Sequence, residues 1–98
     1  MKITEELQLT DEKPAMLQIK NTDKSQVIAI GLKENQVLKK HVTSSPALLV
    51  MLKGKIAFEM EEAVMPLSSF DTFDIPANVP HEVIALEESI FLLIKEKA

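Results

Sequence analysis

Short apolar segments recur along the chain at intervals of about 8 to 12 residues, separated by turn-forming residues. The clearest is 55–61, where Ile56, Phe58 and Met60 alternate with charged or small residues. This two-residue period is typical of a strand with one buried face. Comparable segments lie at 3–9, 15–20, 26–30, 36–41, 47–52, 72–75 and 83–97. The rhythm predicts an all-β fold, an antiparallel sandwich or barrel.

Two of these segments could instead be drawn as helices. Residues 44–52 begin with Ser-Ser-Pro, as a helix N-terminus often does, and 83–97 is rich in Leu, Glu and Lys. Gly54 would then lie inside the first helix, at a cost of about 1 kcal/mol relative to Ala. The apolar residues also form continuous blocks and not a stripe of 3.6-residue period. Such blocks are typical of strands covered on both faces, so we expect strands.

The composition predicts one small domain over residues 1–98. The 98 residues are too few for two cores, and 46% hydrophobic residues are enough for one. A net charge of -4 and only four aromatic residues argue against a nucleic-acid partner, which needs cationic and stacking surfaces. The longest apolar run, 47–52, is far shorter than the roughly 20 residues of a membrane helix, and no signal peptide is evident. We expect a cytoplasmic protein without nucleic-acid or membrane partners.

Candidate chemistry is confined to two histidines, His41 and His81. The chain has no Cys, which excludes disulfides, thiolate nucleophiles and Cys-ligated metals. It also lacks a glycine-rich phosphate loop, a serine nucleophile elbow and a His-Glu-x-x-His motif. Taken alone, either histidine could be an ordinary surface or core imidazole. Their positions within two longer motifs give them more weight.

The segment around His41 resembles the first motif of the cupin family, G-x5-H-x-H-x3-4-E-x6-G. With the last glycine of the motif at Gly54, the first histidine position falls on His41. The second histidine position is then Thr43, and the glutamate position is Ala47. Asn35 stands at the first glycine position.

Residues 70–85 resemble the second cupin motif, G-x5-P-x-G-x2-H-x3-N. Pro76 and His81 match it, while Phe70 and Asn78 stand at its glycine positions and Ala85 at its asparagine position. Asn78 is a mild departure, because Asn tolerates a left-handed backbone better than most residues. The resemblance covers about residues 31–95. It implies a double-stranded β-helix, or jelly-roll barrel, of the small single-domain cupin kind.

The resemblance also implies where a metal would bind. Metal-binding cupins hold their ion with two His and a Glu from the first motif and a His from the second. Here only His41 and His81 remain, because Thr43 and Ala47 occupy the other two positions. A catalytic Zn or Fe site normally needs three protein ligands. We therefore expect at most a weakly held divalent transition metal at His41 and His81.

Strand alternation in such a barrel predicts a set of inward-facing side chains that could line a pocket. They are His41, Thr43, Ala47, Leu49, Met51, His81 and Val83. Two imidazoles and a hydroxyl among apolar groups are the usual make-up of a small-molecule site. The alternative is that the apolar members simply fill the barrel as core.

Three functions are compatible with these features. We favour a small-molecule-binding or sensing barrel without a complete metal site. The second is a metal-dependent enzyme, such as a dioxygenase or isomerase, with a reduced two-histidine site, so whether the protein is an enzyme stays open. The third is a structural or dimerising module, indicated by residues 90–94, which are apolar on both strand faces. A homodimer would cover the second face.

Overall fold

Nine strands and one helical turn make up the computed structural model, which describes residues 1–97. The helix is α1 (Ile3–Glu6). The strands are β1 (Ala15–Asn21), β2 (Ser25–Leu32), β3 (Val37–His41), β4 (Ala47–Lys53), β5 (Lys55–Met60), β6 (Ala63–Ser68), β7 (Thr72–Ile75), β8 (His81–Ala85) and β9 (Ser89–Glu96). The predicted all-β fold is confirmed. In the described residues, no helix is long and apolar enough to cross a membrane.

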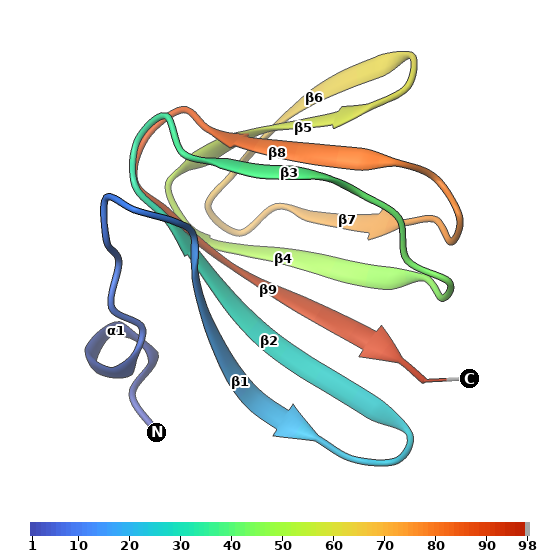
Figure 1. Cartoon of the computed structure of the whole chain (residues 1–98), viewed down its shortest axis with the longest axis horizontal. Coiled ribbons are helices and arrows are strands. Elements are labelled where there is room, and N and C mark those ends of the chain that lie inside the picture. Colours follow the sequence, from blue (N-terminus) through green and yellow to red (C-terminus); the bar gives the residue numbers. More distant parts are fainter. Residues whose placement is uncertain (98) are drawn as a thin grey trace.

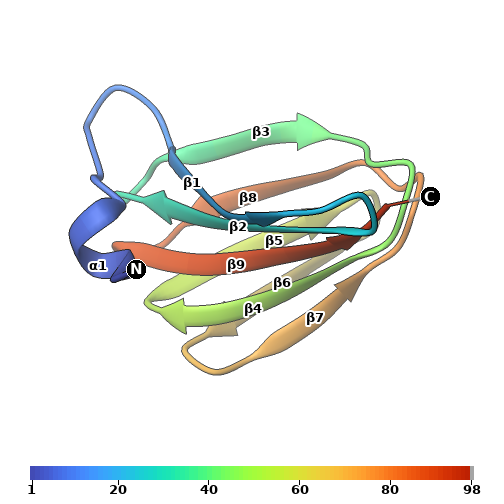
Figure 2. The same ribbon diagram turned by 90° about the horizontal axis from the view of Figure 1, so that it is seen from below.

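The strands form two facing sheets. One has the strand order β1-β2-β9-β4-β7 and the other the order β3-β8-β5-β6. Every pairing between neighbours is antiparallel. Figure 1 shows the four-stranded sheet as a layer above the five-stranded sheet. β1 and β3 are edge strands of different sheets, and Figure 2 shows them along the same side of the barrel.

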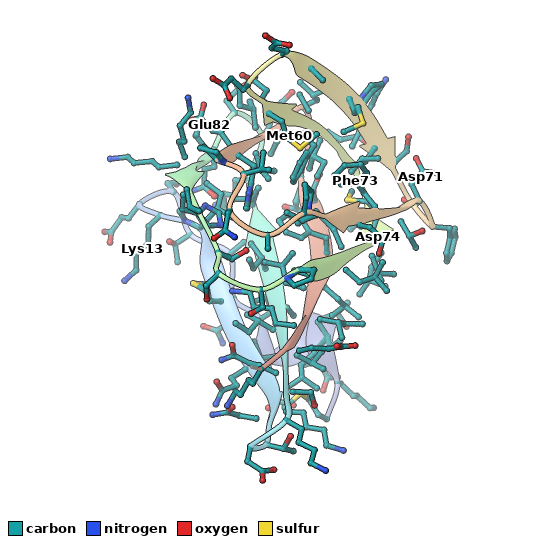
Figure 3. All side chains as sticks on the ribbon, turned by 90° about the vertical axis from the view of Figure 1, so that its right-hand side faces the viewer. Lys13, Met60, Asp71, Phe73, Asp74 and Glu82 are labelled. Atoms are coloured by element: carbon teal, nitrogen blue, oxygen red, sulfur yellow. The ribbon has the colours of Figure 1, made fainter. Side chains whose placement is uncertain are left out.

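The core lies between the sheets and follows the predicted alternation. In β4 the buried positions are Ala47, Leu49 and Met51, and in β5 they are Ile56 and Phe58. Side chains fill the space between the layers (Figure 3), and the ring of Phe73, labelled there, lies 5.1 Å from that of Phe58. Fully burying each such side chain contributes about 1.5–3 kcal/mol.

The two apolar blocks are strands, as expected. Residues 47–52 lie in β4 and residues 90–94 in β9. The outward-facing members of these blocks, such as Val50 and Leu92, are half-buried. The continuous apolar blocks thus correspond to β4 and β9, which carry apolar side chains on both faces of the five-stranded sheet.

The N-terminal segment is not a strand, contrary to the expected rhythm. Ile3 and Leu7 are four residues apart, so the helical turn α1 brings them to one side. Leu7 is buried against Ala29 and Ile90 on the outer face of the five-stranded sheet. Figure 2 shows α1 at the end of β2 and β9 where this cluster forms. The chain itself therefore supplies part of the outer cover that we expected from a partner.

Candidate functional site

The two histidines lie opposite each other on adjacent strands. β3 pairs with β8, and His41 is the register partner of His81. Leu38 pairs with Val83, so three residue steps on β3 match two on β8. This β-bulge lets both Leu38 and His41 face the interior despite their odd spacing. As a result, the Nε2 atoms of the two rings are 3.0 Å apart.

The two rings have different surroundings. His81 is only 3% exposed, and its ring stacks on Phe58 with centroids 5.4 Å apart. Its Nδ1 lies 3.1 Å from the backbone oxygen of Val79. His41 is half-buried, and its Nδ1 lies 2.9 Å from the backbone oxygen of Lys39. His81 thus supports the pair from inside, while His41 is the ring that solvent can reach.

These contacts decide the protonation of the pair. A carbonyl oxygen can only accept, so each Nδ1 must carry a hydrogen and donate it. In two neutral rings, both Nε2 atoms would then point lone pairs at each other across 3.0 Å. A hydrogen bond between them needs one additional proton on the pair, or a cation that both lone pairs approach. With both rings neutral, the two Nε2 lone pairs therefore converge on one point between the rings.

Burial lowers the pKa of the His81 imidazole, and the neighbouring charges of His41 and Lys95 lower it further. The hydrogen bond to Val79 acts in the opposite direction and is outweighed. His81 is therefore neutral at neutral pH and offers its Nε2 as the acceptor.

The remaining residues of the predicted pocket are divided by the structure. Leu49 and Val83 line the interior space beside the two rings. Ala47 and Met51 are buried in the main core and do not line that space. Thr43 lies in the loop after β3, where its hydroxyl donates to the Ser45 oxygen at 3.0 Å. This hydroxyl is engaged in shaping the loop.

The interior beside the rings is closely packed. No space wide enough for a water molecule remains between the side chains there. Phe58, Phe91 and Leu49 are among the side chains that fill it. Any ligand of the pair must therefore approach from the side of His41.

A groove of about 400 Å³ provides that approach, between the edge strands β1 and β3. Its lining residues are Met16, Ile28, Ile30, Leu38, Lys39, Lys40, His41, Leu93 and Lys95. Leu38, His41 and Leu93 also line the interior space, so the groove ends at the histidine pair. This volume lies within the range of small-molecule sites.

Of the residues that line this groove, the pocket predicted from the sequence contained only His41. Lys95 could have been found, because it continues the inward alternation of Phe91 and Leu93 on β9. Met16 could not, because it lies on the edge strand β1, and the distance between the edges β1 and β3 depends on how the two sheets pack.

A second groove, of about 440 Å³, lies between the N-terminal segment and the start of β1. Glu6, Gln8, Thr10 and Lys13 contribute its polar lining. It contains neither imidazole and does not reach the core. We therefore place the candidate site at the groove beside His41.

The backbone supports the motif alignment independently. Among the described residues, four have a positive φ: Asn35 (72°), Gly54 (87°), Phe70 (72°) and Asn78 (64°). These are the four positions at which the cupin motifs have glycine. A left-handed backbone is the reason for glycine at such positions, so the turns of the motifs persist where their glycines do not.

No family model and no curated protein matches the sequence. Solved structures do match over nearly the whole chain. A double-stranded β-helix protein of Klebsiella pneumoniae has a TM-score of 0.88 at 16% identity, covering 98% of this chain and 87% of its own. A cupin superfamily protein of Desulfitobacterium hafniense has a TM-score of 0.85 at 13% identity, covering 91% and 82%. The chain has the cupin fold. KdgF of a Halomonas species is also similar, with a TM-score of 0.87 at 17% identity, covering 100% and 93%.

The cupin fold raises the question of a metal, and the residues present do not complete a site for one. His41 and His81 supply two nitrogens that converge, each ring oriented by a backbone carbonyl as metal-ligating histidines are. The described residues contain no group of three or more His, Cys, Asp or Glu side chains that could hold an ion. Ala47 has no donor, and the hydroxyl of Thr43 is bonded to Ser45. Two converging nitrogens are fewer than the three protein ligands of a catalytic Zn or Fe site.

Proposed function

We propose that this protein is a small-molecule-binding or sensing barrel whose ligand occupies the groove between β1 and β3. The observation that carries the proposal is that a groove of about 400 Å³ with a mostly apolar floor ends at the imidazole of His41. Apolar walls with a few convergent polar groups are the usual composition of a ligand site.

The histidine pair gives the groove its specificity in this proposal. His41 lines the groove, and His81 lies on the core side of His41, with the two Nε2 atoms 3.0 Å apart. A ligand oxygen at the groove end would replace water around His41 without entering the packed interior. Binding would therefore require no rearrangement of the core.

NMR titration tests this proposal, because a chain of 98 residues gives resolved amide signals. A panel of small acids, amides, amines and sugars should contain members that shift the amide signals of Leu38, His41 and Leu93. These shifts should be lost in His41→Ala. Gln8→Ala, in the second groove, is the matched control and should bind as the parent protein does. The proposal fails if no compound shifts these signals, or if His41→Ala binds unchanged.

A metal-dependent enzyme is the second candidate, and the convergent Nε2 lone pairs favour it. With two donors from the protein, we derive no reaction step through a metal. Elemental analysis of protein purified without an affinity tag distinguishes the candidates. A stoichiometric transition metal that is lost in His81→Ala would support the enzyme, and its absence together with ligand binding would support the barrel proposed first.

We also propose a homodimer. α1 covers only one end of the outer face of the five-stranded sheet, and Leu48, Val50, Leu92 and Ile94 remain half-buried on that face. A second copy would cover these side chains. Sedimentation analysis on dilution should reveal a dimer that Val50→Lys dissociates. A monomer at all concentrations would contradict this assembly.

A further inference from the structure

The chemistry of the groove narrows the class of ligand, on the premise that the groove is the binding site proposed above. We infer that it takes a small carboxylic acid with an unbranched or aromatic apolar tail. The carboxylate would lie among Lys39, Lys40 and Lys95, and the tail would lie against Met16 and Leu38.

The charge of the groove is opposite to that of the protein. The chain has a net charge of -4, yet the charged side chains that line the groove are three lysines, with no carboxylate among them. The bulge in β3 places Lys39 and Lys40 together at the rim. Lys95 contributes from β9, on the opposite sheet.

These lysines have no carboxylate partners within the described residues. The two ion pairs found there join Lys33 to Asp11 and Lys53 to Glu88. The carboxylate of Glu82, labelled in Figure 3, accepts from the backbone nitrogen of Lys40 at 3.3 Å, so it places one negative charge beside the three lysines but forms no ion pair with them. Three lysine ammonium groups therefore remain available to an incoming anion.

The floor of the groove decides which anion fits. Its apolar lining is the exposed Met16 of β1 and the half-buried Leu38 of β3, together with the buried Ile28, Ile30 and Leu93. A free phosphate would leave this surface uncovered. The chain also has no Arg, the residue best suited to bidentate phosphate binding. A carboxylate with an apolar tail could pair its charge with the lysines and cover the apolar lining with its tail.

The size of the groove limits the tail. About 400 Å³ corresponds to the liquid volume of roughly 13 water molecules, at about 30 Å³ each. A ligand of on the order of ten non-hydrogen atoms fits this space, as an eight-carbon acid does. Octanoate is therefore the probe, with octanamide and octylamine as neutral and cationic controls of equal length.

NMR titration of the full chain measures the affinities. Octanoate should bind most tightly, octanamide at least fivefold more weakly, and octylamine more weakly still. The variant Lys39→Gln/Lys40→Gln/Lys95→Gln should lose about tenfold in octanoate affinity at low salt while its octanamide affinity stays unchanged. High salt should weaken octanoate binding to the parent protein and have little effect on the triple variant. Lys55→Gln, an exposed lysine away from the groove, is the matched control.

The outcomes separate this inference from the proposed function. If octanamide or octylamine binds as tightly as octanoate and His41→Ala abolishes it, the groove is a ligand site but its anion preference is refuted. If octanoate binds equally to the parent and the triple variant, the role of the lysines is refuted. If none of the three probes binds, the acid inference fails, and the broader panel described above decides whether the binding function fails with it.

Discussion

Replacing each histidine of the pair by Ala should have unequal effects on stability. His81→Ala removes a ring that is 3% exposed, a hydrogen bond to Val79 and the stacking on Phe58. The hydrogen bond contributes about 1 kcal/mol, the stacking about 1 kcal/mol, and the lost packing of the buried ring brings the total to about 3 kcal/mol. His41→Ala removes a half-buried ring with one hydrogen bond, so about 1 kcal/mol is expected.

Urea unfolding followed by far-ultraviolet circular dichroism measures both losses, because the chain has no Trp or Tyr to report by fluorescence. The loss in the double variant should differ from the sum of the two single losses by about 0.5 kcal/mol or more, since the Nε2–Nε2 contact couples the two sites. Val42→Ala, at an exposed position next to His41, is the control and should change stability by under about 0.5 kcal/mol. A larger loss for His41→Ala than for His81→Ala would refute the assignment of the inner and outer rings.

Three further predictions concern the backbone and the pH dependence. Gly54→Ala should destabilise by about 3 kcal/mol, because φ is 87° and a Cβ would lie 2.2 Å from the Glu88 carbonyl oxygen. Gly31→Ala should cost clearly less, since the nearest atoms there are ends of leucine side chains that can rotate; equal losses by urea unfolding would contradict this. Phe70→Gly should stabilise by about 1 kcal/mol, because Phe70 has a φ of 72° and its side chain is 86% exposed; a loss of stability on urea unfolding would show that this side chain makes a stabilising contact. Because the pKa of His81 is lowered from 6.5, the unfolded chain takes up its proton first as pH falls, so this group should reduce stability progressively below about pH 6.5. Urea unfolding from about pH 8 to about pH 5 should show this slope in the parent protein and not in His81→Phe.

Most strands were predictable because their residues alternate between the core and the outside. β5 shows this best, since Ile56 and Phe58 are buried and their neighbours are not. β6 was not predicted as a strand, because Val64 and Pro66 are both exposed and the segment has no clear two-residue period. It forms because β5 pairs with it across a tight turn, which is a tertiary constraint that its own residues do not encode.

The histidine pair could be predicted only in part. Strand alternation predicted that His41 and His81 face the same pocket, and their Nε2 atoms lie 3.0 Å apart. The bulge that turns His41 inward lies between Leu38 and His41, where a strict two-residue period would turn it outward. The groove depends on the separation of β1 and β3, two edges of different sheets, and no local pattern reports such a separation.

Phe70 shows how motif and backbone can disagree with side-chain preference. The alignment placed it at a glycine position, and the structure gives it the left-handed backbone that the position demands. The turn is held by other contacts: the Asp71 carboxylate accepts from the Ser68 nitrogen at 2.8 Å, and the Phe70 nitrogen donates to the Met51 oxygen at 2.9 Å. Because these hydrogen bonds fix the turn, it can hold Phe70 in a left-handed backbone conformation that is unfavourable for a residue other than glycine.

The two substitutions in the first motif have different consequences for the site. Ala47 is buried in the main core where the motif has a glutamate, and it does not line the closely packed space beside the two rings. Thr43 uses its hydroxyl and its carbonyl to join the loops at the mouth, the carbonyl accepting from the Asn78 nitrogen at 2.8 Å. His41 is therefore the polar group of the predicted pocket that faces the groove, which Lys39, Lys40 and Lys95 also line. In the proposed binding mode, a ligand in the groove between β1 and β3 would therefore contact the imidazole of His41 directly and that of His81 only through His41.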